Sequence, residues 1–273
     1  MNAKIVSQLV MLVALLSFGF SLAQAQSPVA ADTAKAAKPI AAEQRTTIET
    51  VVREYLLNNP SILREVMQAL QVKEEKERQA RAAANLQAHQ AELYADPDTP
   101  TAGNPKGDVT IAVFFDYNCG YCKKTLPGLS TLLAKDPSLK VVYKELPVLG
   151  TTSLLGARAA LAAHKQGKYA AFHEALVQLP NITLEEIKTL AERLGLDYGR
   201  LVKDLEDAKT LESLERVARL ATALEINGTP AYIVGEQLIP GAIDADALAQ
   251  LVANERAKLA KAKAGVASAI APR

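Results

Sequence analysis

The stretch from Val109 to Leu146, VTIAVFFDYNCGYCKKTLPGLSTLLAKDPSLKVVYKEL, constrains the fold more than any other part of the chain. It opens with a nearly continuous run of apolar, β-branched and aromatic residues, which is typical of a strand covered on both faces. A helical apolar pattern follows from Leu126, and a second strand-like run begins at Leu139. The order predicts a βαβ unit, and both cysteines of the chain lie where its first strand ends and its helix begins.

The remainder of the chain adds helices and then returns to strands. Helical signals extend from about 151 to 224, including a capping box from Thr183 to Glu186. The segment INGTPAYIVGEQLIPG then predicts a hairpin turning at Gly235-Glu236, and Asp244 opens a closing helix. We therefore expect an α/β domain over 96–263 with a helical insertion at about 151–224, and a flexible tail over 264–273.

The first 25 residues have the pattern of a cleaved secretory signal. Lys4 precedes an apolar stretch from Leu9 to Phe20, and Ala23-Gln24-Ala25 is a small-residue cleavage site. The apolar run is short for a membrane span, which needs ~20 residues. Its removal leaves 30 basic and 30 acidic residues, and this balance gives no indication of a nucleic-acid partner. We expect export to the periplasm and a flexible leader over 26–42.

Two amphipathic helices are predicted after the leader, within an N-terminal segment over 43–95. Asn59 ends the first, and Pro60 is a favoured first residue for the second. Their apolar stripes consist of Ile48, Val51, Val52, Tyr55 and Leu56, followed by Ile62, Leu63, Val66, Met67 and Leu70. Helices this short need a partner surface. The charged, Ala-rich connector that follows favours association between copies through residues 43–70, as a dimer or trimer, over packing on the main domain.

Cys119 and Cys122 could form a structural staple, a metal site or a redox couple. A staple closing so small a loop would constrain the unfolded chain little. A closed zinc site needs four ligands, and the three histidines, His89, His164 and His173, fall in helical stretches where solvated or half-buried positions are expected. Binding of Cu(I) by the two thiols remains an alternative, because soft thiolates suit that ion.

The redox interpretation follows from the position of the pair at a helix start. Unsatisfied N–H groups and the helix dipole there stabilise a thiolate at Cys119. Cys122 lies one turn further on the same face, where it can attack a mixed disulfide formed by Cys119. We expect Lys123 and Lys124 in the same turn to be solvated.

The paired segments FFDYNCGYCK and INGTPAYIVG resemble the thioredoxin-like thiol:disulfide oxidoreductases of the DsbA family over about Asp96 to Ala262. With VVREYLLNNPSILREVMQAL included, the chain resembles most the ScsC branch of that family (suppressor of copper sensitivity), whose N-terminal helices mediate oligomerisation. The resemblance implies a thioredoxin-like fold with an inserted helical domain and an N-terminal helical oligomerisation segment.

The resemblance also implies roles for individual residues. Cys119 would be the nucleophile and Cys122 the resolving thiol of a redox-active disulfide. Pro230 would be a cis-proline facing them, and the backbone of Thr229 would pair with an extended substrate. Strong DsbA oxidases carry an acidic residue where this chain has Val113. Asp116 or Glu145 could relay the proton instead, although both are expected to be surface carboxylates.

The expected function is that of a periplasmic thiol:disulfide interchange protein that acts on cysteine-containing proteins without a cofactor. Isomerase or reductase work is favoured over DsbA-like oxidase work, because an oligomer presents several cysteine pairs to one misfolded substrate. The resemblance implies a membrane-bound redox partner similar to the DsbD and ScsB reductases. A copper-tolerance protein that sequesters Cu(I) at the two cysteines is the alternative of a different class.

Overall fold

The structure is a computed structural model that describes residues 41–270. The predicted signal peptide at 1–25 and the predicted leader up to residue 40 lie outside the described residues. The described residues divide into two compact units, 41–64 and 65–270.

The first unit contains α1 (Ala42–Asn58) and the first turn of α2 (Pro60–Ala88). Asn59 ends α1, because its backbone N–H and its side-chain amide both donate to the carbonyl oxygen of Tyr55, at 2.9 and 2.8 Å. Pro60 is the first residue of α2, as its fixed backbone angle favours. No residue of α1 is buried, and its exposed large apolar side chains are Ile48, Val51, Val52, Tyr55 and Leu57.

The second unit is built on a five-stranded sheet with the order β1-β3-β2-β4-β5. The parallel pair β2 and β3 is in register from Val109 opposite Leu139 to Phe115 opposite Glu145, and the other three pairings are antiparallel. The strands are β1 (Thr101–Gly103), β2 (Val109–Phe115), β3 (Leu139–Glu145), β4 (Ala231–Val234) and β5 (Gln237–Pro240). The predicted βαβ unit and the predicted hairpin at Gly235-Glu236 are both confirmed.

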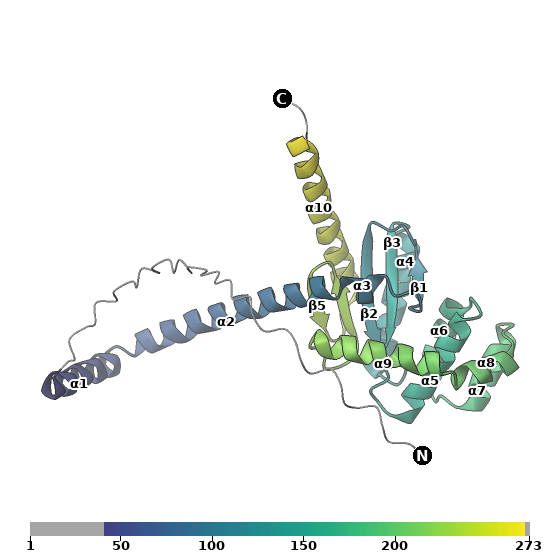
Figure 1. The fold of residues 1–273 in the computed structure, drawn as a ribbon, viewed down its shortest axis with the longest axis horizontal. Helices are drawn as coiled ribbons and strands as arrows, with labels where there is room; N and C mark the ends of the chain where they lie inside the picture. The colour runs from purple at the N-terminus through teal and green to yellow at the C-terminus, as the bar shows by residue number, and fades with distance from the viewer. Residues whose placement is uncertain (1–40, 271–273) are drawn as a thin grey trace, which may run out of the picture. The chain divides into compact units, whose positions relative to one another are not determined.

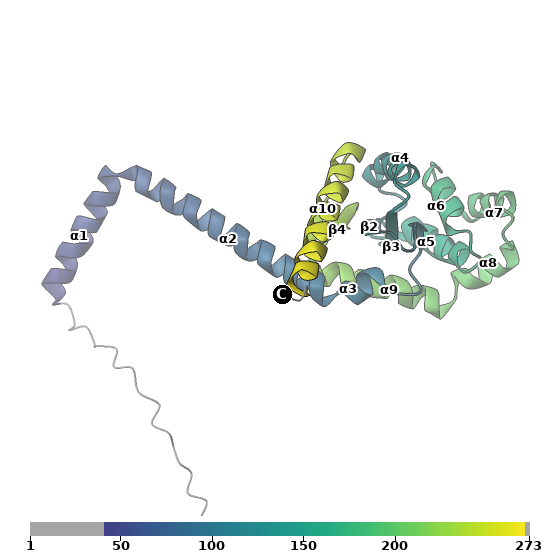
Figure 2. The same cartoon turned by 90° about the horizontal axis from the view of Figure 1, so that it is seen from above.

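Helices cover both faces of the sheet (Figures 1 and 2). On one face, α4 (Gly120–Lys135) and α10 (Ala245–Ile270) pack against β2 side chains such as Ile111 and Val113. On the other, α9 (Ala208–Ala223) packs against Ala112 and Phe114. Successive residues of β2 therefore enter opposite cores, which explains why its sequence is apolar throughout.

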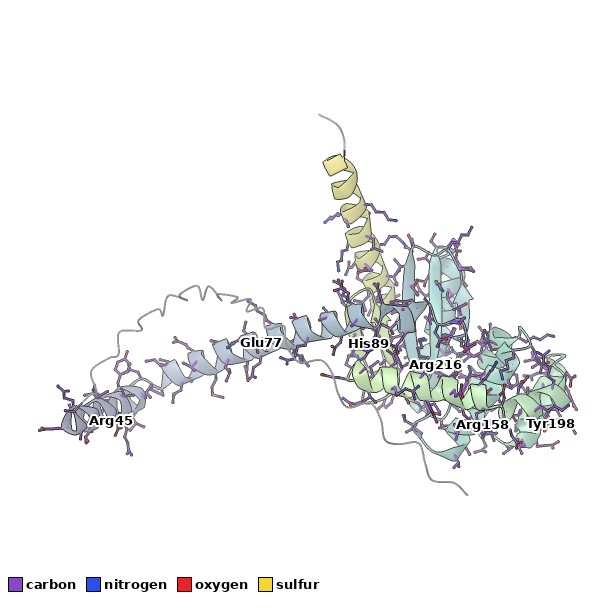
Figure 3. All side chains as sticks on the ribbon, viewed as in Figure 1. Arg45, Glu77, His89, Arg158, Tyr198 and Arg216 are labelled. Carbon is purple, nitrogen blue, oxygen red and sulfur yellow. The ribbon has the colours of Figure 1, made fainter. Side chains whose placement is uncertain are left out.

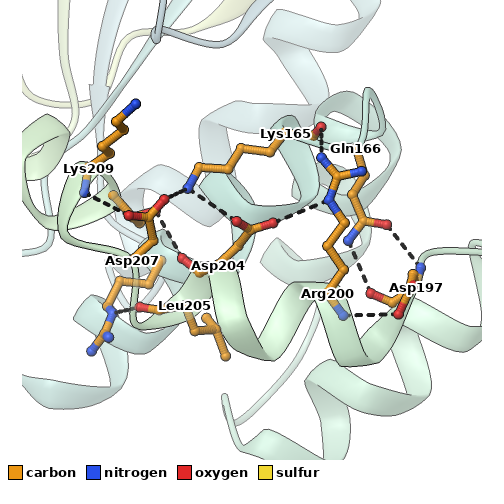
Figure 4. A network of polar contacts seen from close by, with 10 residues as sticks. Lys165, Gln166, Asp197, Arg200, Asp204, Leu205, Asp207 and Lys209 are labelled. Atoms are coloured by element: carbon orange, nitrogen blue, oxygen red, sulfur yellow. Dashed lines mark hydrogen bonds and ion pairs between the residues drawn. The ribbon is translucent and has the colours of Figure 1, made fainter.

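The helical insertion consists of α5 (Thr151–His164), α6 (Tyr169–Val177), α7 (Leu184–Arg193) and α8 (Tyr198–Leu205). Thr183 is the N-cap of α7, as the sequence predicts, because the amide of Glu186 donates to its hydroxyl at 3.2 Å. Charged groups join the helices at the surface (Figure 4). Lys165 at the end of α5 reaches Asp204 at 3.4 Å and Asp207 at 2.5 Å.

Three features of this unit differ from the sequence-based expectations. The insertion was expected to reach 224, but α9 packs on the sheet through Val217 and Leu220 as well as on α5 through Leu214. The stretch Thr101–Gly103 forms β1, for which no strand was expected, because a three-residue edge strand has too little pattern to detect. The tail expected over 264–273 is helical as far as Ile270, because α10 continues through it.

The end of the expected connector is part of the domain. Leu86 of α2 and Leu93 of α3 (Gln90–Tyr94) are buried in the same core as α9. Lys144 of β3 is buried and donates to the carbonyl oxygen of Glu92 at 2.7 Å, which joins α3 to the sheet. Arg216 of α9, labelled in Figure 3, pairs with Asp96 at 3.6 Å and with Asp98 at 2.8 Å.

Between residues 41 and 270, none of the helices combines the length and the apolar character that a membrane span requires.

Truncation of Leu93 tests the docking of α3. Because this side chain is 0% exposed, we expect Leu93→Ala to lower the free energy of unfolding by about 2–5 kcal/mol. Leu184→Ala, at a leucine that is 54% exposed, should change it by no more than about 0.5 kcal/mol. Urea unfolding followed by circular dichroism measures both, and equal effects would show that α3 is not part of the folded core.

Candidate active site

The two cysteines lie at the junction of β2 and α4. After β2 ends at Phe115, a short turn leads to Cys119, which is the N-cap residue of α4. The backbone N–H of Cys122 donates to the sulfur of Cys119, with 3.4 Å between nitrogen and Sγ. The Cys119 sulfur thus occupies the capping position, where the first N–H groups of a helix favour a negatively charged partner.

Thr229 and Pro230 face this pair from the loop before β4. The peptide bond between them is cis. The thiol of Cys119 donates to the carbonyl oxygen of Thr229 across 3.2 Å. The structure therefore brings together predicted site residues that are 110 positions apart in the sequence.

Cys122 is the deeper of the two thiols. It is 1% exposed against 6% for Cys119, and burial raises the pKa of its thiol well above the usual range. Two hydroxyls lie behind it: Thr125 donates to the Cys122 carbonyl oxygen at 3.1 Å, and Tyr232 donates to Thr125 at 2.7 Å. Tyr232 is paired in register with Val113. Val113 is the position at which, by resemblance, strong DsbA oxidases carry an acidic residue.

Asp116 was expected at the surface, but it is buried, with 1% of its area exposed. Its two carboxylate oxygens accept four hydrogen bonds from neighbouring loops, from the backbone amides of Asn118, Val148 and Leu149 and from the hydroxyl of Ser153. A carboxylate at the end of a strand can be buried in this way only because its acceptor sites are filled.

Glu145 was also expected at the surface and is instead 2% exposed. Its Oε1 accepts the hydroxyls of Tyr117, at 2.9 Å, and of Tyr169, at 2.6 Å. The Tyr117 hydroxyl also lies 2.8 Å from Nδ1 of His173. Burial raises the pKa of Glu145 to about 8 and lowers the pKa of His173 to about 3.

These four side chains form a buried polar cluster that joins β3 and the cysteine loop to α6 of the insertion. The expectation of a solvated or half-buried His173 is wrong. The sequence did not predict the burial of His173 or of the two tyrosines. A polar residue in a helical pattern is usually solvated, and its burial depends on strands that are distant in the sequence. The run of aromatic residues around the cysteines was the one available signal.

Of the two lysines after Cys122, Lys123 is less solvated than expected, whereas Lys124 is exposed as expected. The ammonium of Lys123 donates to the carbonyl oxygen of Leu179 at 2.7 Å, which joins α4 to the segment after α6. Lys124 lies over the Tyr121 ring, 5.6 Å from its centroid. Among residues 41–270, no group of three His, Cys, Asp or Glu side chains is placed to hold a metal ion.

The raised pKa of Glu145 predicts a pH dependence of stability. Between pH 4.5 and about pH 8 the carboxyl keeps its proton in the folded chain but loses it in the unfolded chain. The unfolded state therefore binds fewer protons, and the free energy of unfolding falls as pH rises through this window, by at most ~1.4 kcal/mol per pH unit.

The measurement is the difference in the free energy of unfolding between the natural chain and Glu145→Gln at pH 5, 6, 7 and 8. Gln has no charge to lose, and His173 is present in both chains, so the difference isolates Glu145. It should decline steadily with rising pH. A difference that stays constant from pH 5 to 8 would show that Glu145 does not titrate in this window.

Comparison with known proteins places this geometry in a family. The family model for the DSBA-like thioredoxin domain matches residues 110–253. A second model, described as the copper resistance protein ScsC N-terminal domain, matches residues 44–77.

Solved structures agree with both matches. A thioredoxin-like oxidoreductase from Silicibacter pomeroyi is 40% identical, with a TM-score of 0.59, over 61% of this chain and 96% of that one. Proteus mirabilis ScsC in a transitional conformation is 31% identical, with a TM-score of 0.59, over 81% of this chain and 98% of that one.

Among curated relatives, the thiol:disulfide interchange protein DsbA of Bordetella parapertussis is 24% identical over 55% of this chain and 74% of its own length. The Na(+)/H(+) antiporter NhaA 3 of Salinispora tropica is 27% identical over 58% of this chain, and there the match spans only 25% of the relative. The resemblance stated from the sequence is confirmed. Because one family model covers more than half of its residues, the chain belongs to the family of DSBA-like thioredoxin domains.

Proposed function

We propose that this chain is a thiol:disulfide interchange protein that acts on cysteine-containing proteins. The observation that carries the proposal is the position of Cys119, which caps α4 with its sulfur and faces the Thr229 carbonyl oxygen at 3.2 Å. A helix N-terminus supports the thiolate that attacks a disulfide. A backbone carbonyl at the same sulfur marks the place where a substrate main chain can pair.

The exchange proceeds in two steps. The Cys119 thiolate attacks one sulfur of a substrate disulfide, which forms a mixed disulfide and releases the other substrate sulfur as a thiolate. Cys122 then loses its proton and attacks the Cys119 sulfur, which forms the Cys119–Cys122 disulfide and releases the second substrate sulfur. The two electrons of the reduced pair end in the substrate, and a reductant must restore the pair for the next cycle.

The burial of Cys122 favours isomerase work over oxidase work. Because burial raises the pKa of its thiol, Cys122 is held as a thiol at neutral pH and resolves the mixed disulfide slowly. A long-lived mixed disulfide gives a second cysteine of the substrate time to attack and form a different pairing. The substrate's backbone would pair with Thr229 beside Pro230 while this happens.

The cellular setting follows from the same proposal. Residues 1–25 have the pattern of a signal peptide, so we infer a periplasmic location, where disulfides persist. A chain working as an isomerase needs a supply of electrons, and we propose a membrane-bound reductase of the DsbD or ScsB type as the donor. A DsbA-like oxidase would instead need a partner that removes electrons.

Refolding of a scrambled-disulfide protein tests the proposal. The reduced chain should restore activity to the scrambled substrate, and Cys119→Ala should abolish this. Cys122→Ala should retain part of the activity, because a substrate thiol can release Cys119 without it. Failure of the natural chain to refold the substrate, together with tight binding of one Cu(I) per cysteine pair, would favour the copper-tolerance function suggested by the N-terminal match.

We also propose that copies associate through residues 43–70, as a dimer or trimer. The exposed large apolar side chains are Ile48, Val51, Val52, Tyr55 and Leu57 in α1, and Leu63, Val66, Met67 and Leu70 in the first half of α2. Helices with an exposed apolar stripe are stabilised by packing against another helix. Every copy of the chain carries the same stripes, so a second copy can supply that helix.

Charge placed on the stripe tests the association. Val52→Glu puts a carboxylate on the apolar face of α1, and we expect it to lower the solution mass to that of a monomer, because burying an unpaired charge is unfavourable. Thr50→Glu makes a similar change on the opposite face and should keep the natural mass. Light scattering gives both values, and a monomeric natural chain would contradict the proposal.

A further inference from the structure

We propose that Tyr232 is a positioning residue for the resolving step of the exchange. Through Thr125, its hydroxyl holds the turn of α4 that carries Cys122 in the place from which this thiol attacks the mixed disulfide. The inference rests on the disulfide exchange proposed above, and it assigns a role in one of the two steps to a side chain outside the cysteine pair.

The turn that carries Cys122 begins a helix whose backbone hydrogen bonding is interrupted. Pro127 lies inside α4 and has no N–H, so the carbonyl oxygen of Lys123 lacks the partner that a regular helix would provide. This first turn is therefore joined to the rest of α4 by fewer backbone hydrogen bonds than usual. Side-chain contacts from other elements can replace what the backbone lacks.

Tyr232 supplies such a contact from β4. Its hydroxyl donates to Oγ1 of Thr125 at 2.7 Å, and Thr125 donates in turn to the carbonyl oxygen of Cys122 at 3.1 Å. Consecutive hydrogen bonds of this kind strengthen one another. Because the Tyr232 side chain is only 2% exposed, the surrounding core fixes its ring and keeps the hydroxyl directed at α4.

The phenol of Tyr232 acts as a hydrogen-bond donor and not as a base. Burial, with smaller contributions from charge on Cys122 and on Cys119, raises the pKa of Tyr232 to about 12. The phenol therefore keeps its proton at neutral pH and cannot take the proton of Cys122. The effect of both sulfurs on this pKa also shows that the hydroxyl lies within electrostatic reach of the cysteine pair.

The short segment from Thr229 to Tyr232 thus contacts both members of the cysteine pair. At its start, the Thr229 carbonyl oxygen accepts the Cys119 thiol at 3.2 Å. At its end, Tyr232 reaches the turn of Cys122 through Thr125. The segment enters β4, which is paired with β2, the strand that leads to Cys119. One strand of the sheet therefore sets the positions of the attacking thiol and of the resolving thiol.

The place of Tyr232 in the sheet gives it this role. Val113 of β2 is paired with Tyr143 on one side and with Tyr232 on the other. Tyr143 turns toward the insertion, where its ring centroid lies 4.6 Å from that of His173. Tyr232 turns toward the cysteine helix. Where the resemblance places an acidic residue in strong DsbA oxidases, this chain has a valine, and a hydroxyl from the neighbouring strand lies behind Cys122.

Tyr232→Phe tests the inference, because it removes the hydroxyl and keeps the ring. The reduced chain is mixed with oxidised glutathione, samples are quenched with acid, and the adduct on Cys119 is followed by mass spectrometry. Attack by Cys119 forms the adduct and releases one glutathione, and attack by Cys122 then removes the adduct and releases the second. We expect Tyr232→Phe to slow removal roughly five-fold, the effect of one hydrogen bond, and to leave formation unchanged.

Variants of Thr125 test the route, and they serve alone if Tyr232→Phe does not fold. Thr125→Val should slow removal of the adduct by a similar factor, whereas Thr125→Ser keeps a hydroxyl and should stay close to the natural rate. The double variant Tyr232→Phe/Thr125→Val should be no slower than either single variant, because each breaks the same chain of hydrogen bonds. Two independent structural defects would instead multiply.

Tyr94→Phe is the matched control. The hydroxyl of Tyr94 is buried but has no hydrogen-bond partner among the described residues, so its loss should change neither rate. Natural rates of removal in Tyr232→Phe and Thr125→Val, equal slowing of formation and removal, or multiplied effects in the double variant would overturn the inference. Failure of the proposed function differs, because the natural chain would then form no adduct.

Discussion

The parallel pairing of β2 with β3 determines where everything else in the site lies. Parallel strands need a crossover connection, and here α4 supplies it. The helix must therefore begin at the carboxyl end of β2. That requirement places Cys119 at the N-cap and Cys122 one turn deeper. It also leaves the carboxyl ends of β2 and β3 side by side, which brings Asp116 and Glu145 to the same end of the sheet.

Buried polar groups then stabilise the structure at this end of the sheet. Asp116 joins the cysteine loop to the loop before α5, and the cluster of Glu145, Tyr117, Tyr169 and His173 joins it to α6. An apolar core would hold these segments with less directional specificity, whereas hydrogen bonds to a buried carboxylate allow one geometry. The insertion and the redox pair are thus connected through side chains that the exchange chemistry itself does not use.

The local signals in the sequence predicted much of this architecture. The apolar run at 109–115, the cysteine spacing and the segment around Thr229 gave the βαβ unit, the hairpin and the residues that meet at the site. The incorrect predictions of exposure share a cause, because the burial of a polar residue depends on partners that are distant in the sequence. Asp116, Glu145 and His173 read as surface residues because their hydrogen-bond partners come from other elements. The docking of Leu86 and Leu93 was missed because two leucines in a polar stretch form no periodic stripe.

The central claim is that Cys119 attacks a substrate disulfide and Cys122 resolves the product. Capture of the intermediate tests it most directly: Cys122→Ser is mixed with a scrambled-disulfide protein, and the products are separated without reductant and mapped by mass spectrometry. The account predicts a stable adduct in which the substrate is bonded through Cys119, and an adduct with the natural chain that decays with time because Cys122 resolves it. No adduct with Cys122→Ser, or an adduct of Cys119→Ser bonded through Cys122, would contradict it.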